Sequence, residues 1–321
     1  MTSPDSSLVT RHSSLTLGPV VGLLDFLFGK GKGGGKGRKK PLKRIDVSKR
    51  FDLTGRTGQG SMSKVFRAYD REIGRNVCLK LLDKLKTKKF EDRFTAWGLK
   101  KPSEGEICVQ LRHDNIVRTF EHGITFSGDP YLVMEWVEGY GLTYLIETKN
   151  AQLNGTRIQY LGQLCDAVQY LHDNKWLHRD ICPRNVMIDE QGVLKLIDFG
   201  LTIPYEPAFC QPGNRTGTAD YLAPEIIKRK ATDNRVDLFA LGATAYELFT
   251  GQLPWERSPS SEETLRRHLN TPPRNPKDLK PDLGDDLAKV LLKAVAKEPT
   301  DRFGSAASFK DALLKLKRQD Y

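Results

Sequence analysis

The chain has 321 residues, of which 38% are hydrophobic and 28% are charged, a composition typical of a soluble globular protein with a hydrophobic core. No apolar run reaches the roughly 20 residues that a helix needs to cross a bilayer, so the sequence does not indicate a membrane-spanning protein. Five widely spaced cysteines without a CxxC pair argue against a disulfide framework or a zinc site and favour reduced thiols in the cytoplasm: Cys78, Cys108, Cys165, Cys182 and Cys210.

The net charge of +11 is unevenly distributed along the chain. Residues 1–50 carry a net charge of +8, whereas the remaining 271 residues carry +3. The basic character therefore belongs to the amino-terminal tail, and a nucleic-acid-binding surface on the folded part is not indicated.

Residues 1–47 are predicted to form a disordered basic tail with a short apolar segment. The apolar segment is "LGPVVGLLDFLF" (17–28), and the low-complexity stretch "GKGKGGGKGRKKPLKR" (29–44) follows it. A signal peptide is not favoured, because the positive charge mainly follows the apolar run. The run from Val21 would make a plausible protein start, so we also consider that residues 1–20 result from a mis-called start codon.

Two functions of this tail stay open. It serves as a solubilising linker, or residues 29–50 bring the chain to an anionic membrane surface, where each basic residue contributes about 1 kcal/mol. Nucleic acid or an acidic partner would also match these charges.

From about residue 48 the pattern changes to one of regular secondary structure. "FDLTGRTGQGSMSKVFRAYD" (51–70) predicts a β-hairpin, and "RNVCLKLLD" (75–83) and "DPYLVMEWVEG" (129–139) predict further strands. "GEICVQLRH" (105–113) has helical spacing, and helices are also expected over 155–173, 235–250, 284–297 and 305–317. Short strands are expected at "VMID" (186–189) and "VLKLID" (193–198). A small β-rich part before a larger helical part predicts an α+β fold with two lobes.

Three stretches carry side chains suited to phosphate chemistry. In "GQGSMSKV", Gly58 and Gly60 would let backbone N–H groups approach anionic oxygens, although glycine hairpins are also common structural features. Ser63 stands where a G-x-G-x-x-G loop has its third glycine. Lys80 follows in a strand, and a functional role for it requires an acidic partner. Glu104 and Glu106 are the candidates.

The stretch "LHRDICPRN" (177–185) is more specific. Asp180 and Asn185 lie on a tight loop, because the strand "NVMI" begins at once. The turn "DEQG" (189–192) then returns the chain, so Asp198 should arrive beside Asn185. A carboxylate and an amide are oxygen ligands suited to Mg²⁺ that carries a phosphate chain. Asp180 is left to orient a hydroxyl group and accept its proton.

In these motifs, together with "DFG" and "GTADYLAPE", the chain resembles a eukaryotic-type (Hanks-type) Ser/Thr protein kinase. The resemblance covers nearly everything outside the tail and implies a bilobal kinase domain over residues 48–318. Its β-rich amino-terminal lobe, with one main helix, would span about 48–135, and its mostly helical carboxy-terminal lobe about 139–318. The implied cofactors are ATP and Mg²⁺, and the implied partners are protein substrates with Ser/Thr acceptors.

The resemblance also implies catalytic roles. Lys80 should bind the α- and β-phosphates and pair with Glu104, which lies nine residues before His113. Four residues after Glu104 is a cysteine, which can pack on the DFG phenylalanine, whereas the glutamine four residues after Glu106 would be buried and unpaired. Asp180 should be the catalytic base, and the Mg²⁺ ligands are Asn185 and Asp198.

Further roles follow for the nucleotide pocket and its supports. Met134 matches the gatekeeper of a hinge, where the backbones of Glu135 and Val137 would bind adenine. The other cofactor-binding positions are Gly58, Gly60, Val65, Cys78 above the adenine, Lys80 and Met187 below it. Glu225 should pair with Arg302, and Asp237 should anchor the catalytic loop.

Two positions in the catalytic loop depart from the Ser/Thr pattern. Cys182 stands where Ser/Thr kinases usually have a lysine, and Arg184 lies where many tyrosine kinases place an arginine. We hypothesise that Arg184 replaces the missing lysine at the γ-phosphate. Thr218 is the activation-segment threonine typical of Ser/Thr kinases, so Ser/Thr specificity is favoured and dual specificity stays open. A pseudokinase or nucleotide-binding scaffold is the other alternative.

Arg179, directly before Asp180, suggests control by phosphorylation of the activation segment. The candidate acceptors are Thr216, Thr202 and Tyr205. The alternative is that this segment orders without a phosphate.

Overall fold

The computed structural model describes residues 42–59, 63–213 and 215–316. The predictions about residues 1–41, including most of the basic stretch 29–50 and the proposed start at Val21, lie outside the described residues. Gly60 lies outside them as well.

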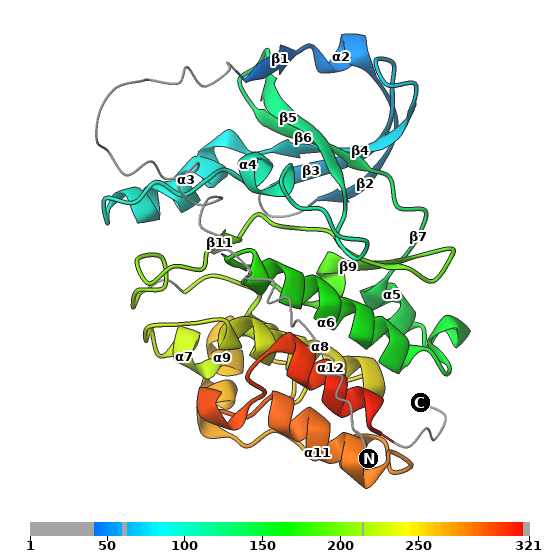
Figure 1. The fold of residues 1–321 in the computed structure, drawn as a ribbon, viewed down its shortest axis with the longest axis vertical. Coiled ribbons are helices and arrows are strands. Elements are labelled where there is room, and N and C mark those ends of the chain that lie inside the picture. Colours follow the sequence, from blue (N-terminus) through cyan, green and yellow to red (C-terminus); the bar gives the residue numbers. More distant parts are fainter. Residues whose placement is uncertain (1–41, 60–62, 214, 317–321) are drawn as a thin grey trace, which may run out of the picture. The chain divides into compact units, whose positions relative to one another are not determined.

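The first part of the described chain forms a six-stranded sheet with the order β1-β5-β6-β4-β3-β2 (Figure 1). The strands are β1 (Lys43–Ile45), β2 (Phe51–Gln59), β3 (Ser63–Asp70), β4 (Arg75–Leu82), β5 (Thr119–Thr125) and β6 (Pro130–Glu135). The predicted hairpin and the two predicted strands that follow it are confirmed. The register pairs Cys78 with Met134 and Val65 with Lys80, which brings the strands of the hairpin and of the hinge together.

The strand β1 was not expected from the sequence. It runs parallel to β5, with Lys43 opposite Gly123, and helix α2 (Val47–Arg50) follows it. From the sequence, residues 42–47 are expected in the tail, whereas in the structure Lys43–Ile45 belong to the sheet and Val47 begins α2. A strand of three residues whose partner lies about 80 residues away leaves no local pattern, and its lysine and arginine continue the basic run before it.

Two helices lie between β4 and β5. The first precedes Glu104, and the second begins with it. Helix α3 (Lys84–Thr95) begins at Asp83, whose side chain accepts hydrogen bonds from the amides of residues 85 and 86. Helix α4 (Glu104–Cys108) begins with a capping box between Ser103 and Glu106. The sequence predicts a helix near α4 but not α3, because α3 is strongly charged and shows only the two buried phenylalanines of one face.

The remaining described chain is mostly helical. Its helices are α5 (Leu142–Glu147), α6 (Arg157–Asp173), α7 (Pro224–Ile227), α8 (Arg235–Thr250), α9 (Ser261–Asn270), α10 (Pro276–Leu279), α11 (Asp285–Ala294) and α12 (Ala306–Leu314). Its short strands are β7 (Gly139–Gly141), β8 (Trp176–Leu177), β9 (Val186–Asp189), β10 (Leu194–Leu196) and β11 (Ile203–Pro204). The four predicted long helices correspond to α6, α8, α11 and α12, so the α+β expectation is confirmed. Helix α9 was not predicted.

Helix α8 is the centre of the helical part. Every residue from Val236 to Phe249 is buried, and α8 contacts α6 and α11 (Figure 1). Within the described residues, the buried apolar side chains form one large core and two smaller ones, one in the sheet and one between α3 and residues 177–210. No helix in the described part is long and apolar enough to cross a membrane.

The contact between α8 and α11 depends on a glycine. A Cβ atom on Gly242 would lie 2.7 Å from the backbone of Ala294, whereas one on Gly162 in α6 would meet only a lysine side-chain carbon at 3.6 Å. We expect Gly242→Ala to lower the free energy of unfolding by about 1–3 kcal/mol through overpacking. Gly162→Ala should raise it by up to about 1 kcal/mol through helix propensity. Urea unfolding of both variants checks this, and equal effects of the two substitutions would contradict it.

Candidate nucleotide and phosphoryl-transfer site

Lys80 on β4 is the central cation of the candidate site. Its Nζ atom donates hydrogen bonds to Oε1 of Glu104 at 2.6 Å and to Oδ1 of Asp198 at 3.0 Å. The Lys80 and Glu104 residues are only 4% and 6% exposed. The other candidate acid, Glu106, accepts a hydrogen bond from the backbone of Ser103 in the capping box, so it caps α4. The structure therefore pairs Lys80 with Glu104.

The charges in this group stabilise one another. Burial by itself would lower the pKa of Lys80, but the carboxylates of Asp198 and Glu104 outweigh it, so the pKa of this lysine is raised. The side chain of Asp198 is 42% exposed, so partial burial works only weakly against its ionised form, and Lys80 and the amide of Gly200 keep its pKa below the ordinary value. Glu104 is buried near a second carboxylate, and burial raises its pKa; its 2.6 Å bond to Lys80 favours the ionised form. We therefore treat the group as one ammonium between two carboxylates.

Asp180 lies on the loop after β8 and is held from two sides. Its Oδ1 atom accepts hydrogen bonds from the amide and the hydroxyl of Thr218 at 2.9 and 2.8 Å. Its Oδ2 atom and its backbone carbonyl accept from the Asn185 amide at 3.0 and 2.7 Å. The carboxylate is thus fixed in orientation, and it remains partly exposed.

Asn185 and Asp198 come together through the hairpin β9–β10. The amide of Ile197 donates to the backbone carbonyl of Asn185 at 3.0 Å, which places the two strands' ends side by side. Gly200 donates its amide to Asp198 Oδ1 at 2.9 Å, and the side chain of Phe199 is buried against the His178 ring, with centroids 5.1 Å apart. Because the amide nitrogen of Asn185 bonds Asp180, its oxygen is the atom available to a cation.

The loop itself is anchored by Asp237 of α8. This fully buried carboxylate accepts hydrogen bonds from the amides of His178 and Arg179 at 2.9 and 2.7 Å, and it contacts His172 Nε2 at 2.9 Å. Arg179 has a φ of +69°, a backbone conformation that is costly for a residue with a side chain. The two charge-assisted bonds from this turn to Asp237 offset that cost. The resemblance pointed to Asp237, but no sequence signal pointed to His172.

The predicted adenine-binding positions lie on neighbouring strands. Gly58 pairs with Val65 in the hairpin β2–β3, and Cys78 lies opposite Met134. The amide of Glu135 donates to the carbonyl of residue 118 at 2.9 Å, so this amide is already occupied within the sheet.

The remaining two predicted adenine positions are Val137, which follows β6, and Met187. Val137 is 8% exposed, and Met187 on β9 is half-buried and packs on the main core, as Cys78 does.

Cys182 and Arg184 have different surroundings. Cys182 is 1% exposed, and burial raises the pKa of its thiol to about 11, so it is an inward-facing neutral side chain. Arg184 is exposed, and its Nη2 atom donates to the Thr218 hydroxyl at 2.9 Å. The Arg184 guanidinium is therefore connected to Asp180 through the Thr218 hydroxyl, which bonds both.

The candidate phosphorylation sites differ in access. Thr202 is fully buried, and the Tyr205 hydroxyl donates to Asn234 Oδ1 at 3.2 Å. Thr216 is half-buried. Arg179 is 5% exposed, and its charge lies near Cys210 and Asp237. Of the three acceptors, Thr202 is inaccessible in this conformation.

A pocket joins the residues around Lys80. Four predicted site residues, Lys80, Glu104, Asp180 and Asp198, line it. It is also lined by Phe90, Glu91 and Lys101, which the sequence analysis did not single out, because their place depends on the unpredicted helix α3 and the segment after it.

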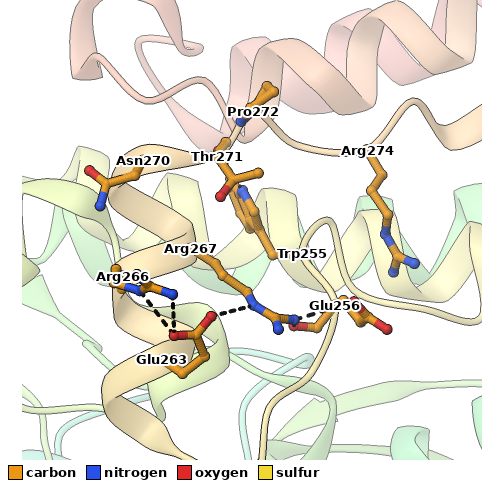
Figure 2. A pocket seen from close by; sticks show the side chains of 9 residues that line it. All are labelled: Trp255, Glu256, Glu263, Arg266, Arg267, Asn270, Thr271, Pro272 and Arg274. Atoms are coloured by element: carbon orange, nitrogen blue, oxygen red, sulfur yellow. Dashed lines mark hydrogen bonds and ion pairs between the residues drawn. The ribbon is translucent and has the colours of Figure 1, made fainter.

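A second, more open pocket of about 400 Å³ lies beside α9 (Figure 2). It contains none of the predicted site residues. Four of its charged side chains pair with one another, since Glu263 bonds Arg266 and Arg267, and Arg267 also bonds Glu256. The fifth, Arg274, bonds Gln252 and the carbonyl of Leu253. Trp255 forms part of its lining and donates to the carbonyl of Thr271 at 2.8 Å. We therefore place the candidate site at Lys80.

Comparison with known proteins assigns this arrangement to a family. The model of the protein kinase domain family matches residues 51–314, so the chain belongs to the protein kinase family. This confirms the bilobal α+β fold class.

The chain is also similar to curated serine/threonine-protein kinases of bacteria. The chain is 34% identical to the probable serine/threonine-protein kinase PknB of Corynebacterium glutamicum, over 85% of this chain and 43% of that protein. It is 34% identical to the serine/threonine-protein kinase Pkn1 of Myxococcus xanthus, over 82% and 38% of the two chains. It is 32% identical to PknB of Mycobacterium tuberculosis, over 84% and 43%. The resemblance to Hanks-type Ser/Thr kinases is confirmed, and the match spans less than half the length of each relative.

The anchoring carboxylate gives a pH-dependent prediction. Burial works to raise the pKa of Asp237, but His172 and the loop amides outweigh it, so its pKa is lowered. Its stabilising effect is therefore present above the ordinary pKa of about 3.8 and lost as the pH falls through the lowered value. We expect Asp237→Asn to lower the free energy of unfolding at pH 7 by about 3–5 kcal/mol.

Urea unfolding between pH 7 and pH 3 measures this effect. The variant should lose less stability than the wild type in acid, because it lacks the titrating group. Asp286→Asn, at a side chain that is 85% exposed, should stay within about 0.5 kcal/mol of the wild type. Parallel pH profiles for wild type and Asp237→Asn would contradict the assignment.

Proposed function

We propose that this protein is an ATP-dependent kinase that transfers the γ-phosphoryl group to Ser/Thr hydroxyls of protein substrates. The observation that supports this is the convergence of three charged groups from separate elements. Lys80 of β4, Glu104 of α4 and Asp198 after β10 form one hydrogen-bonded group. Asp180 lines the same pocket, and Asn185 is hydrogen-bonded to it.

The side chains present fit Mg²⁺ and a triphosphate. Asn185 offers an amide oxygen and Asp198 a carboxylate, which are hard ligands of the kind that Mg²⁺ takes together with phosphate oxygens. Lys80 offers an ammonium held in place by Glu104, suited to the α- and β-phosphates. Mg-ATP, when bound, supplies the phosphoryl group and neutralises charge on its oxygens. Two protein ligands suffice, because phosphate oxygens and water complete the octahedral shell.

Asp180 is proposed as the catalytic base. Thr218 and Asn185 fix its two oxygens, so one face of the carboxylate can orient a substrate hydroxyl and accept its proton. Thr218 belongs to the segment "GTADYLAPE" that would carry the protein substrate, so its bond to Asp180 links substrate docking to the base. This supports a Ser/Thr acceptor.

The alternatives make different predictions for the same side chains. A pseudokinase would bind nucleotide without turnover, and the intact set of Lys80, Asp180, Asn185 and Asp198 argues against it. A dual-specificity kinase would also phosphorylate tyrosine, which the position of Arg184 leaves open.

We further propose that the protein acts in the cytoplasm, which the five free cysteines support. The binding of residues 29–50 to an anionic membrane surface or an acidic partner stays a prediction from composition, which sedimentation of the chain with anionic and neutral vesicles can test.

The proposed activity is tested by removing one carboxylate at a time. We expect the wild type to phosphorylate Ser/Thr in a degenerate peptide library. Asp180→Asn and Asp198→Asn should each lower kcat by about 10²–10⁴-fold, since one removes the base and the other a metal ligand. Asp286→Asn, a matched change at an exposed carboxylate, should leave kcat unchanged. Turnover that persists in Asp198→Asn, or its absence in the wild type, would reject the proposal.

The role of Arg184 gives a second test. We expect Arg184→Ala to lower kcat by about 10–100-fold, the equivalent of one charge-assisted hydrogen bond to the transferred phosphate. Arg184→Lys should recover part of the loss, because it keeps the charge without the bidentate geometry. Steady-state kinetics with the preferred peptide measure both, and full kcat in Arg184→Ala would contradict the role.

A further inference from the structure

The small core between α3 and the activation segment is not explained by the proposed chemistry. Here the activation segment means residues 198–225. Phe90 and Phe94 of α3 pack with Ile203, Phe209 and Cys210 of that segment and with Leu177 of β8. Phe94 is fully buried and Phe209 is 3% exposed, with their ring centroids 5.6 Å apart.

The two phenylalanines of α3, Phe90 and Phe94, also contact the segment that leads to Glu104. Phe90 and Phe94 meet edge to face at 5.6 Å, and the Lys101 ammonium lies 5.3 Å from the Phe90 ring centroid. Lys101 is 6% exposed and donates to the carbonyl of Pro102 at 3.0 Å. Leu99 packs on this core, and its amide donates to the carbonyl of Phe94 at 3.0 Å. The chain from residue 99 to the start of α4 is therefore held by α3.

The activation segment has separate ties to the helical part. Ile203 pairs with Leu177, and the amide of Tyr205 donates to the carbonyl of Lys175 at 2.7 Å. The amide of Thr232 donates to the carbonyl of Cys210 at 3.0 Å. The contact between Phe209 and Phe94 adds a link of another kind, since it joins this segment to the helix that contacts Leu99 and Lys101, which precede α4.

We propose that Phe94 is a positioning residue that couples the activation segment, through Phe209, to the Lys80–Glu104 pair. Phe94 does not line the pocket at Lys80, so it would act through other residues. Loss of the contact releases the segment carrying Thr218 and, through residues 99–103, the acid that orients Lys80. Only the kinetic measurement described below rests on the proposed function.

The first measurement is hydrogen exchange by mass spectrometry. Phe209→Ala should speed exchange within residues 201–213 and also within residues 99–108, although the substitution lies about 100 positions from the second range. Phe94→Ala should give the same two changes, and the double variant should add little to either single one, because both remove the same contact. Phe303→Ala, at a buried ring stacked on Phe309 at 4.9 Å, is the matched control and should change neither range.

The second measurement separates positioning from loss of folded protein. Phe94→Ala should raise KM for both ATP and peptide by about 3–10-fold, whereas a smaller folded fraction would lower the apparent kcat alone. Phe94→Leu, which keeps a buried apolar side chain, should recover most of the loss and serves if the alanine variant does not fold.

Unchanged exchange in residues 99–108 of Phe209→Ala, or additive effects in the double variant, would overturn the proposal. If the wild type is inactive, the proposed kinase function is rejected. The exchange measurement still tests the coupling between Phe209 and residues 99–108, because it does not depend on activity.

Discussion

A lysine that is buried has to be matched by negative charge, and this constraint organises the candidate site. An unpaired ammonium in the interior would be strongly disfavoured, so Lys80 is stable only with Glu104 and Asp198 beside it. The two acids come from α4 and from the end of the hairpin β9–β10, far apart in the sequence. The central strands of the sheet, the short helix and the loop with Asp180 are therefore tied to one point.

In the helical part, the buried charge is negative and is stabilised by hydrogen-bond donors. Asp237 is a carboxylate buried in α8, and the amides of the catalytic loop together with His172 stabilise it. A helix that is buried from Val236 to Phe249 gives a rigid base for a loop that contains a residue at positive φ. The ion pair of Arg302 with Glu225, at 2.7 and 2.8 Å, ties the end of the activation segment to the same region. The proposed base is thus held by groups that do not take part in the chemistry.

Helix α3 holds the activation segment through an apolar contact. The outer face of α3 is basic, and its inner face carries two phenylalanines four residues apart. These phenylalanines pack against the activation segment. Apolar contact is insensitive to the protonation and phosphorylation that change ion pairs, so this link acts alongside any control through Arg179. Cys182 and Arg184 show a second departure, in which the inward position carries a neutral thiol and the positive charge comes from an exposed position two residues later.

The sequence by itself determined the elements with strong local patterns and the residues inside dense motifs. The hairpin, the buried strands and the four long helices follow from hydrophobic periodicity, and Lys80, Asp180, Asn185 and Asp198 follow from motif order. Even the choice of Glu104 over Glu106 could be argued, because burial of a cysteine costs less than burial of a glutamine. Tertiary structure alone decided the rest: the pairing of β1 with β5, the burial of Thr202, the partner of Arg184 and the packing of Phe94 on Phe209. Each of these depends on contacts between residues tens of positions apart, and such contacts leave no periodic or compositional trace in the local sequence.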